Sequence, residues 1–110
     1  MNKGILMISL GRLLMNIDLE EIFKNAFEIA KKNGLPKYKD ELENIRFDKN
    51  KGLYDLCINA DFAGLFAGEI INILSKIKTI DVMAISKIIN SCFMENKKIP
   101  TKEIENLIFL

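Results

Sequence analysis

The cysteines and the lack of histidine limit the chemistry that this sequence can perform. Cys57 and Cys92 are the two cysteines, they form no CxxC pair, and the chain contains no histidine. Zinc sites usually need clustered cysteine and histidine ligands, and many nucleophilic mechanisms need an imidazole base. We therefore expect two buried, reduced thiols, with no zinc site and no disulfide framework.

The acidic and basic residues show a spacing typical of a solvated helix face. Glu20 and Lys24, and then Glu28 and Lys32, are each four residues apart in the order that stabilises an exposed helix. The acidic and basic residues do not form a cluster that would bring an acid and a base to one point. We therefore predict that the protein is not an enzyme, that it has no catalytic residue and that it uses no cofactor.

Length and composition favour a packed domain without a strong electrostatic field. The chain has 110 residues, of which 49% are hydrophobic, and this is enough to form a core. Sixteen Lys and Arg against fifteen Asp and Glu leave a net charge of +1, with Arg12 and Arg46 as the arginines. We expect a protein partner held by shape and apolar contact, and no nucleic acid.

An apolar run near the start of the chain raises the question of a membrane segment. It extends from Ile5 to Ile17, is interrupted by Ser9, Gly11, Arg12 and Asn16, and is too short to span a bilayer. It also lacks a signal-peptide cleavage pattern. We interpret it as a core helix, and expect a cytoplasmic protein without membrane insertion.

Three segments carry an apolar stripe with the helical period of 3.6 residues. They cover residues 18–32, 64–77 and 81–93, and the second could begin at Asp61. Asp18 and Glu21 resemble a capping box, and Gly34 is placed as a C-cap glycine. A short helix is expected after Pro100. The sequence therefore predicts a structure that is at least about half helical.

The middle of the chain, residues 37–59, fits two patterns. Leu42 and Ile45 continue a helix, whereas the turn-prone residues 48–52 and the apolar residues 53–58 could form a hairpin. We favour helix, turn and helix, and keep the hairpin as the alternative.

A short internal repeat suggests two related helical units. Leu-Pro at 35–36 is followed by Glu-Leu-Glu-Asn-Ile at 41–45, and Ile-Pro at 99–100 is followed by Glu-Ile-Glu-Asn-Leu at 103–107. An amphipathic helix precedes each copy. The chain is therefore expected to be mostly α-helical with two related lobes.

This order of helix, link, helix, loop and helix resembles the paired EF-hands of the calmodulin and myosin light chain superfamily. The resemblance places Leu65 and Ile99 at the eighth loop position, which joins a short inter-loop strand, and Glu69 and Glu103 at the twelfth. It implies two degenerate EF-hand lobes, at residues 1–47 and 48–110, and the first lobe would lack its first entering helix. The alternative is a single compact α-helical domain with a small β-hairpin.

The aligned loops lack the oxygen ligands that calcium needs. Calcium loops usually supply carboxylates at positions one, three and five and a glutamate at twelve. Counting back from Glu69 puts Ile58, Ala60 and Phe62 at positions one, three and five, and counting back from Glu103 puts Cys92, Met94 and Asn96 there. Residues 48–52 begin like a calcium loop, but Asn59 occupies the place of the glutamate. We therefore expect no metal site.

The resemblance implies a non-catalytic, calmodulin-like light chain that clamps an amphipathic helix of a partner, such as the neck of a myosin heavy chain. The expected groove residues are apolar: Leu10, Leu13, Leu14, Ile22 and Leu42 in the first lobe, and Ile70, Ile73, Leu74, Ile85, Ile89, Phe93 and Ile108 in the second. The competing interpretation is that they fill one core. An acidic rim of Glu69, Asp81, Glu95 and Glu105 would favour a basic target helix.

Two other functions remain open at this point. The first is a small helical inhibitor or adaptor of the immunity or anti-defence type, which would act by masking a surface. The second, which the neutral charge disfavours, is nucleic-acid binding through a helix-turn-helix made from residues 61–93.

Overall fold

The computed structural model describes residues 18–109 and places 72% of them in helices. In chain order the elements are α2 (Leu19–Leu42), α3 (Leu53–Cys57), α4 (Ala60–Ile77), β1 (Thr79–Ile80), α5 (Val82–Glu95), α6 (Thr101–Glu105) and β2 (Ile108–Phe109). The prediction of a mostly helical structure is therefore confirmed. The core helix expected at residues 5–17 lies outside the described residues.

The three long helices begin where a side chain accepts the N–H groups of the first turn. Asn59 accepts a hydrogen bond from the Phe62 amide at 2.8 Å, and Asp81 accepts one from the Ala84 amide at 3.0 Å. Asp18 caps α2 in the same way. These caps satisfy donors that have no partner within the helix. The helices predicted from their apolar stripes are confirmed, and α4 begins at Ala60 because Asn59 is its cap.

Helix α2 is longer than predicted, because the expected end at Gly34 is wrong. The helix continues through Pro36 to Leu42, with a kink at Tyr38, where φ is −126° and ψ is 42°. A Cβ atom on Gly34 would lie 2.8 Å from Leu42 Cδ1 and 3.5 Å from Phe62 Cδ2. The glycine therefore allows close packing rather than a left-handed helix end, and burial of Leu42 overrides the stop signals of glycine and proline.

The middle of the chain forms a turn followed by the short helix α3, which confirms helix, turn and helix rather than a hairpin. Two short strands were not predicted. Strand β1 pairs antiparallel with β2, so that Thr79 lies opposite Phe109 and Ile80 opposite Ile108. Helices α5 and α6 separate these strands in the sequence, so they do not form a hairpin. The pairing returns the end of the chain to the junction between α4 and α5.

The loop position that the EF-hand resemblance assigned to Leu65 is wrong. Leu65 lies within α4, and Ile99 lies in the connection before α6 without strand pairing. The physical reason is the buried stripe of Phe62, Phe66 and Ile70, which keeps residues 60–77 in one helix. The two copies of the short repeat also differ, since the first Leu-Pro lies inside α2 and the second Ile-Pro precedes α6.

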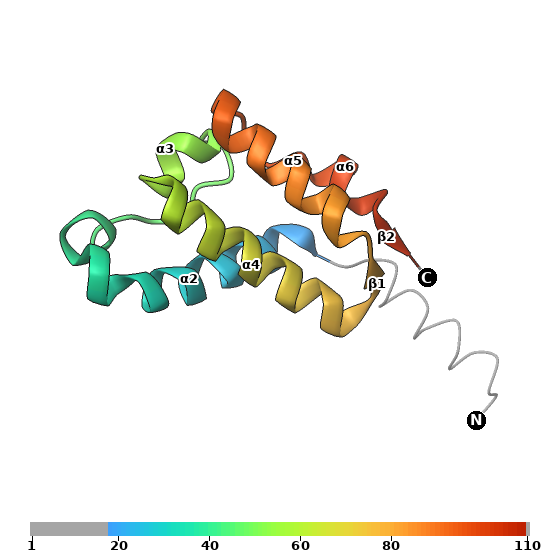
Figure 1. Cartoon of the computed structure of the whole chain (residues 1–110), viewed down its shortest axis with the longest axis horizontal. Helices are drawn as coiled ribbons and strands as arrows, with labels where there is room; N and C mark the ends of the chain where they lie inside the picture. Colours follow the sequence, from blue (N-terminus) through green and yellow to red (C-terminus); the bar gives the residue numbers. More distant parts are fainter. Residues whose placement is uncertain (1–17, 110) are drawn as a thin grey trace.

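The core lies between α2 and α4, which run side by side, and α5 packs against α4 (Figure 1). At its centre, the Phe27 ring contacts the Phe62 ring edge-to-face at 5.3 Å and the Phe66 ring at 5.5 Å. The centroid of the Phe47 ring lies 5.7 Å from that of Phe27 and 6.3 Å from that of Phe66. Such aromatic contacts stabilise a core beyond the area that they bury. One hydrophobic cluster includes residues from both sides of the expected lobe boundary at residue 47.

The kink in α2 is joined to the start of α4 by a small polar cluster. The Tyr38 hydroxyl donates a hydrogen bond to Asp61 Oδ2, and Lys37 Nζ lies 3.0 Å from the same oxygen. The hydrogen bond from Tyr38, with a smaller contribution from Lys37, lowers the pKa of Asp61 below its ordinary value. The cluster therefore favours the folded state when Asp61 is ionised.

We expect the stabilisation by Tyr38 to depend on pH. Because the pKa of Asp61 is lower in the folded chain, its contribution is present above the unfolded carboxyl pKa of about 3.9 and is lost as the pH falls through the folded value. Tyr38→Phe should lower the urea midpoint at about pH 6, and this difference from the wild type should shrink below about pH 4. Tyr54→Phe, at an exposed tyrosine, is the control. If Tyr38→Phe lowers the urea midpoint by the same amount at every pH, the stabilisation does not come from the hydrogen bond between Tyr38 and ionised Asp61.

Candidate functional site

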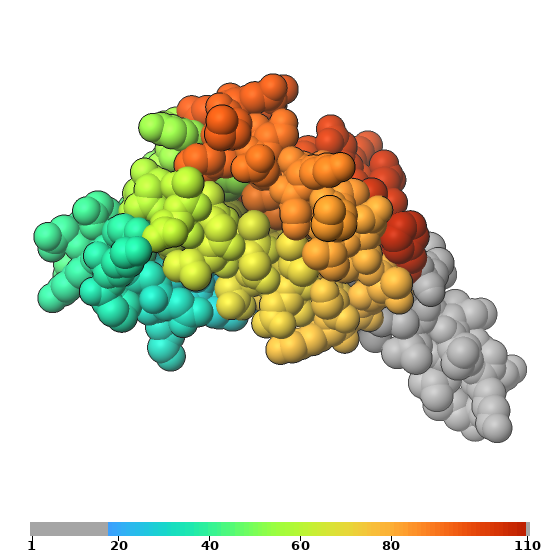
Figure 2. Space-filling view, in the orientation of Figure 1, coloured from blue at the N-terminus to red at the C-terminus, as the bar shows by residue number. Residues whose placement is uncertain are grey.

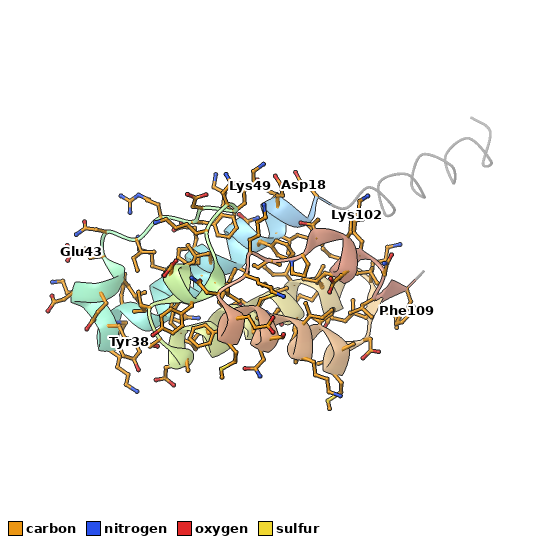
Figure 3. All side chains as sticks on the ribbon, turned by 90° about the horizontal axis from the view of Figure 1, so that it is seen from above. Asp18, Tyr38, Glu43, Lys49, Lys102 and Phe109 are labelled. Carbon is orange, nitrogen blue, oxygen red and sulfur yellow. The ribbon has the colours of Figure 1, made fainter. Side chains whose placement is uncertain are left out.

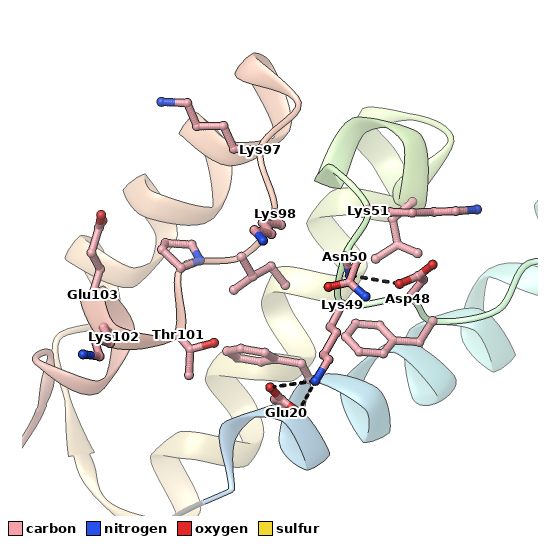
Figure 4. Close-up of a pocket in the computed structure, with 15 residues that line it drawn as sticks. Glu20, Asp48, Lys49, Asn50, Lys51, Lys97, Lys98, Thr101, Lys102 and Glu103 are labelled. Atoms are coloured by element: carbon pink, nitrogen blue, oxygen red, sulfur yellow. Dashed lines mark hydrogen bonds and ion pairs between the residues drawn. The ribbon is translucent and has the colours of Figure 1, made fainter.

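A groove of about 850 Å³ opens between three segments that are distant in the sequence. They are the first turns of α2, the loop before α3, and the connection from α5 into α6 (Figure 4). We call this the lysine groove; its lining residues are Glu20, Phe23, Phe47, Asp48, Lys49, Asn50, Lys51, Leu56, Lys97, Lys98, Ile99, Pro100, Thr101, Lys102 and Glu103. Lys49 and Lys102 lie along the same edge of the molecule (Figure 3).

The two sides of the groove are held together by Asn96. This residue ends α5 in the left-handed conformation, with φ 52° and ψ 47°, and its N–H is bonded to the carbonyls of the last turn. Its side-chain oxygen also accepts the Asp55 amide at 3.2 Å, and its side-chain nitrogen donates to Asp55 Oδ2 at 3.0 Å. The Leu53 amide donates to the Lys97 carbonyl at 2.9 Å. The end of α5 therefore caps the start of α3.

This contact requires a glycine at position 52. A Cβ atom on Gly52 would lie 2.2 Å from Asn96 Oδ1 and 2.3 Å from the Asn96 carbonyl oxygen. Both distances are far below van der Waals contact, and the second involves backbone that cannot rotate away. Gly52 is therefore needed for the close approach of the loop at residues 48–51 to the connection at residues 97–100.

The floor of the groove is apolar. Phe23 and Leu56 are each 3% exposed and belong to the core, whereas Phe47, Ile99 and Pro100 are half-buried. Figure 4 shows Lys97, Lys98 and Lys102 on one side of this floor and Lys49 and Lys51 on the other. The groove thus combines partly exposed apolar groups with a basic edge.

Some of the charges in the groove have structural partners. Lys49 Nζ lies 3.3 Å from Glu20 Oε2, and Asp48 accepts the Asn50 amide at 2.9 Å in the turn before α3. Lys97 Nζ lies 3.0 Å from Glu95 Oε2, and the hydrogen bond that Lys97 donates to this carboxylate raises the pKa of Lys97.

Three other lysines of the edge lack such a partner: within residues 18–109, no ion pair involves Lys51, Lys98 or Lys102. All three side chains are exposed. These lysines supply the positive charge available to a ligand, and the exposed Glu103 of the groove likewise has no ion-pair partner among residues 18–109.

The structure places the described members of the groove expected from the sequence in the core or against it. Leu10, Leu13 and Leu14 lie outside the described residues. Seven of the others are buried, with at most 8% of each residue exposed: Ile22, Leu42, Ile70, Leu74, Ile85, Ile89 and Phe93. The remaining two, Ile73 and Ile108, are partly buried and pack against the core. The expected groove is therefore not open in this structure, because these residues pack against one another.

The expected acidic rim is not assembled either. Asp81 caps the start of α5, and Glu95 pairs with Lys97 at the other end of that helix. The basic edge was missed because a net charge of +1 hides local separation of charge. The signal was present as two short basic clusters, Lys49 with Lys51 and Lys97 with Lys98, each a few residues before a short helix.

Both cysteines are buried, as predicted. Burial raises the pKa of Cys57 to about 12, and burial, helped by the nearby Glu103, also raises the pKa of Cys92. A thiol with a raised pKa stays protonated at neutral pH and is a poor nucleophile. In the part of the chain that the structure describes, no three Cys, Asp or Glu residues are grouped as metal ligands.

Comparisons with protein-family models, with curated proteins and with solved structures return no match. None of the helices between residues 18 and 109 has the length and hydrophobicity needed to cross a membrane.

We expect Gly52→Ala to destabilise the fold by about 2 kcal/mol or more, since the added methyl group overlaps Asn96. The double variant Gly52→Ala, Asn96→Gly should recover only part of this loss, because the backbone carbonyl still blocks the methyl group. Gly64→Ala is the matched control; no atom lies within 4 Å of its Cβ position, and it should stabilise α4 by up to about 1 kcal/mol. Chemical unfolding measures all three, and an unchanged midpoint for Gly52→Ala would refute this contact.

Proposed function

We propose that this chain is a non-catalytic binding protein that holds a segment of another protein in the lysine groove. The observation that carries the proposal is the groove itself, with half-buried Phe47, Ile99 and Pro100 beside lysines that have no ion-pair partner among the described residues. Interfaces commonly combine an apolar centre with a polar rim. The partner gains apolar contact at the floor and charge pairing at the edge.

The rigidity of the surroundings supports a preformed site. The groove is bounded by α2, which packs in the core through Phe23, and by α3, which is tied to α5 through Asn96. A site whose walls are fixed before binding loses less conformational entropy when the partner arrives. A preformed groove also fits an adaptor, a light chain or an inhibitor.

The polar groups of the groove support binding more than catalysis. Of the three groove carboxylates, Glu20 is paired with Lys49 and Asp48 closes a turn, so that the exposed Glu103 is the one without such a partner among the described residues. The two thiols are buried and carry raised pKa values. We therefore keep the prediction that the protein is not an enzyme.

The calmodulin-like light chain, including its paired lobes, its calcium independence and a heavy-chain neck as partner, stays a prediction. Its mode of action, a helix held against an apolar surface, is compatible with the lysine groove. The inhibitor or adaptor alternative would use the same surface, and the identity of the partner separates the two. A cytoplasmic location likewise stays a prediction.

A photo-crosslinking amino acid placed at position 98, on the groove edge, tests the proposal. We expect it to couple to one defined segment of one protein in cell extract, whereas the same probe at the exposed position 76 on α4 should not couple to that segment. Ile99→Asp places a charge on the floor and should reduce the yield at position 98 by about tenfold or more.

Two controls make this experiment decisive. Circular dichroism checks that Ile99→Asp remains helical, and Lys102→Glu offers the same test at an exposed side chain that does not disturb the core. Equal coupling from positions 98 and 76, or coupling that neither variant reduces, would contradict a binding role for the groove.

A further inference from the structure

The lysines on the groove edge indicate the chemistry of the partner. Lys51 comes from the loop before α3, whereas Lys98 and Lys102 come from the connection into α6. The Asn96 contacts bring these two segments together although Asp55 and Asn96 are 41 positions apart. Three lysines on the edge of one groove offer an anionic partner several ammonium groups for charge pairing.

Lysine is well suited to such an edge because its stem is long and flexible. The four carbons can lie along an apolar surface while the ammonium group reaches a carboxylate in solvent. The half-buried side chains of Phe47 and Ile99 supply that surface. A bound segment can therefore contact the floor with an apolar side chain and the edge with an acidic one.

The acidic residues in the groove limit the kinds of anion that fit. Glu20, Asp48 and Glu103 line the same groove as the lysines. A uniform polyanion such as single-stranded nucleic acid would bring phosphates close to these carboxylates. A protein segment can place its acidic side chains beside the lysines and its apolar or neutral side chains beside the carboxylates. The mixed lining favours the protein segment.

We infer that the lysine groove binds an acidic amphipathic segment of a partner protein, with carboxylates that pair with Lys51, Lys98 and Lys102 and an apolar side chain that packs on Phe47 and Ile99. This inference rests on the proposed function. It reverses the expectation from the sequence, in which an acidic rim would favour a basic helix.

Three designed amphipathic helical peptides of about five turns test the inference. They share one apolar face and carry Glu, Gln or Lys at the polar positions. Fluorescence anisotropy with the full chain should show that the Glu peptide binds at least about tenfold more tightly than the Gln peptide, and that added salt weakens its binding. The Lys peptide should bind most weakly.

A matched pair of charge variants locates the binding site. Lys98→Glu with Lys102→Glu should weaken binding of the Glu peptide by about tenfold or more and favour the Lys peptide. Lys76→Glu with Lys87→Glu makes the same change in net charge at exposed lysines on α4 and α5 and should alter affinity by less than about twofold. Loss of affinity in both double variants would show a general charge effect and overturn the inference.

The outcomes also separate this inference from the proposed function. If the Gln or Lys peptide binds as tightly as the Glu peptide and Ile99→Asp abolishes that binding, the groove is a protein-binding site but the partner is not acidic. If the photo-crosslink from position 98 maps to a segment without acidic residues, the same conclusion holds. If a single-stranded oligonucleotide binds the groove more tightly than the Glu peptide, both proposals are overturned.

Discussion

Asn96 connects the two parts of the structure on which the candidate site depends. As the left-handed residue at the end of α5 it satisfies the last turn of that helix, and its side chain caps the start of α3 through Asp55. Few residue types tolerate this backbone conformation, and asparagine adds a donor and an acceptor to it. The adjacent Gly52 permits the approach. This contact and the hydrogen bond from the Leu53 amide to the Lys97 carbonyl hold the loops at residues 48–51 and 97–100 on facing sides of the groove.

The core provides the rigid support for this arrangement. Phe27 packs against Phe62, Phe66 and Phe47, so that α2, α4 and the loop before α3 share one aromatic cluster. The space-filling view shows α5 covering part of α4, so that the long helices form one body (Figure 2). Phe47 belongs to this cluster and also lines the groove. The floor of the site is therefore an extension of the core.

The sequence was sufficient to predict helices that depend on a local apolar pattern. It was insufficient for features that depend on contacts between residues far apart in the chain. The apolar stripes at residues 64–77 and 81–93 predict α4 and α5, because neighbours along each helix determine these stripes. The end of α2 was misplaced, since the meeting of Gly34 with Leu42 and Phe62 is a tertiary contact. The lysine groove could not be predicted for the same reason. Its two basic clusters become one edge only through the contact between α3 and α5.

Amide hydrogen exchange of Leu53 and Asp55 in the full chain is the most direct test of the link through Asn96. Both amides lie in the first turn of α3 and lack partners within that helix, so their protection must come from Lys97 and Asn96. We expect slow exchange in the wild type and exchange roughly five- to tenfold faster in Asn96→Gly, which keeps the left-handed backbone but loses the side chain. The Ala84 amide at the other end of α5 should be unchanged. If the exchange of Leu53 and Asp55 is the same in both proteins, Asn96 does not hold α3, and the groove must be formed in another way.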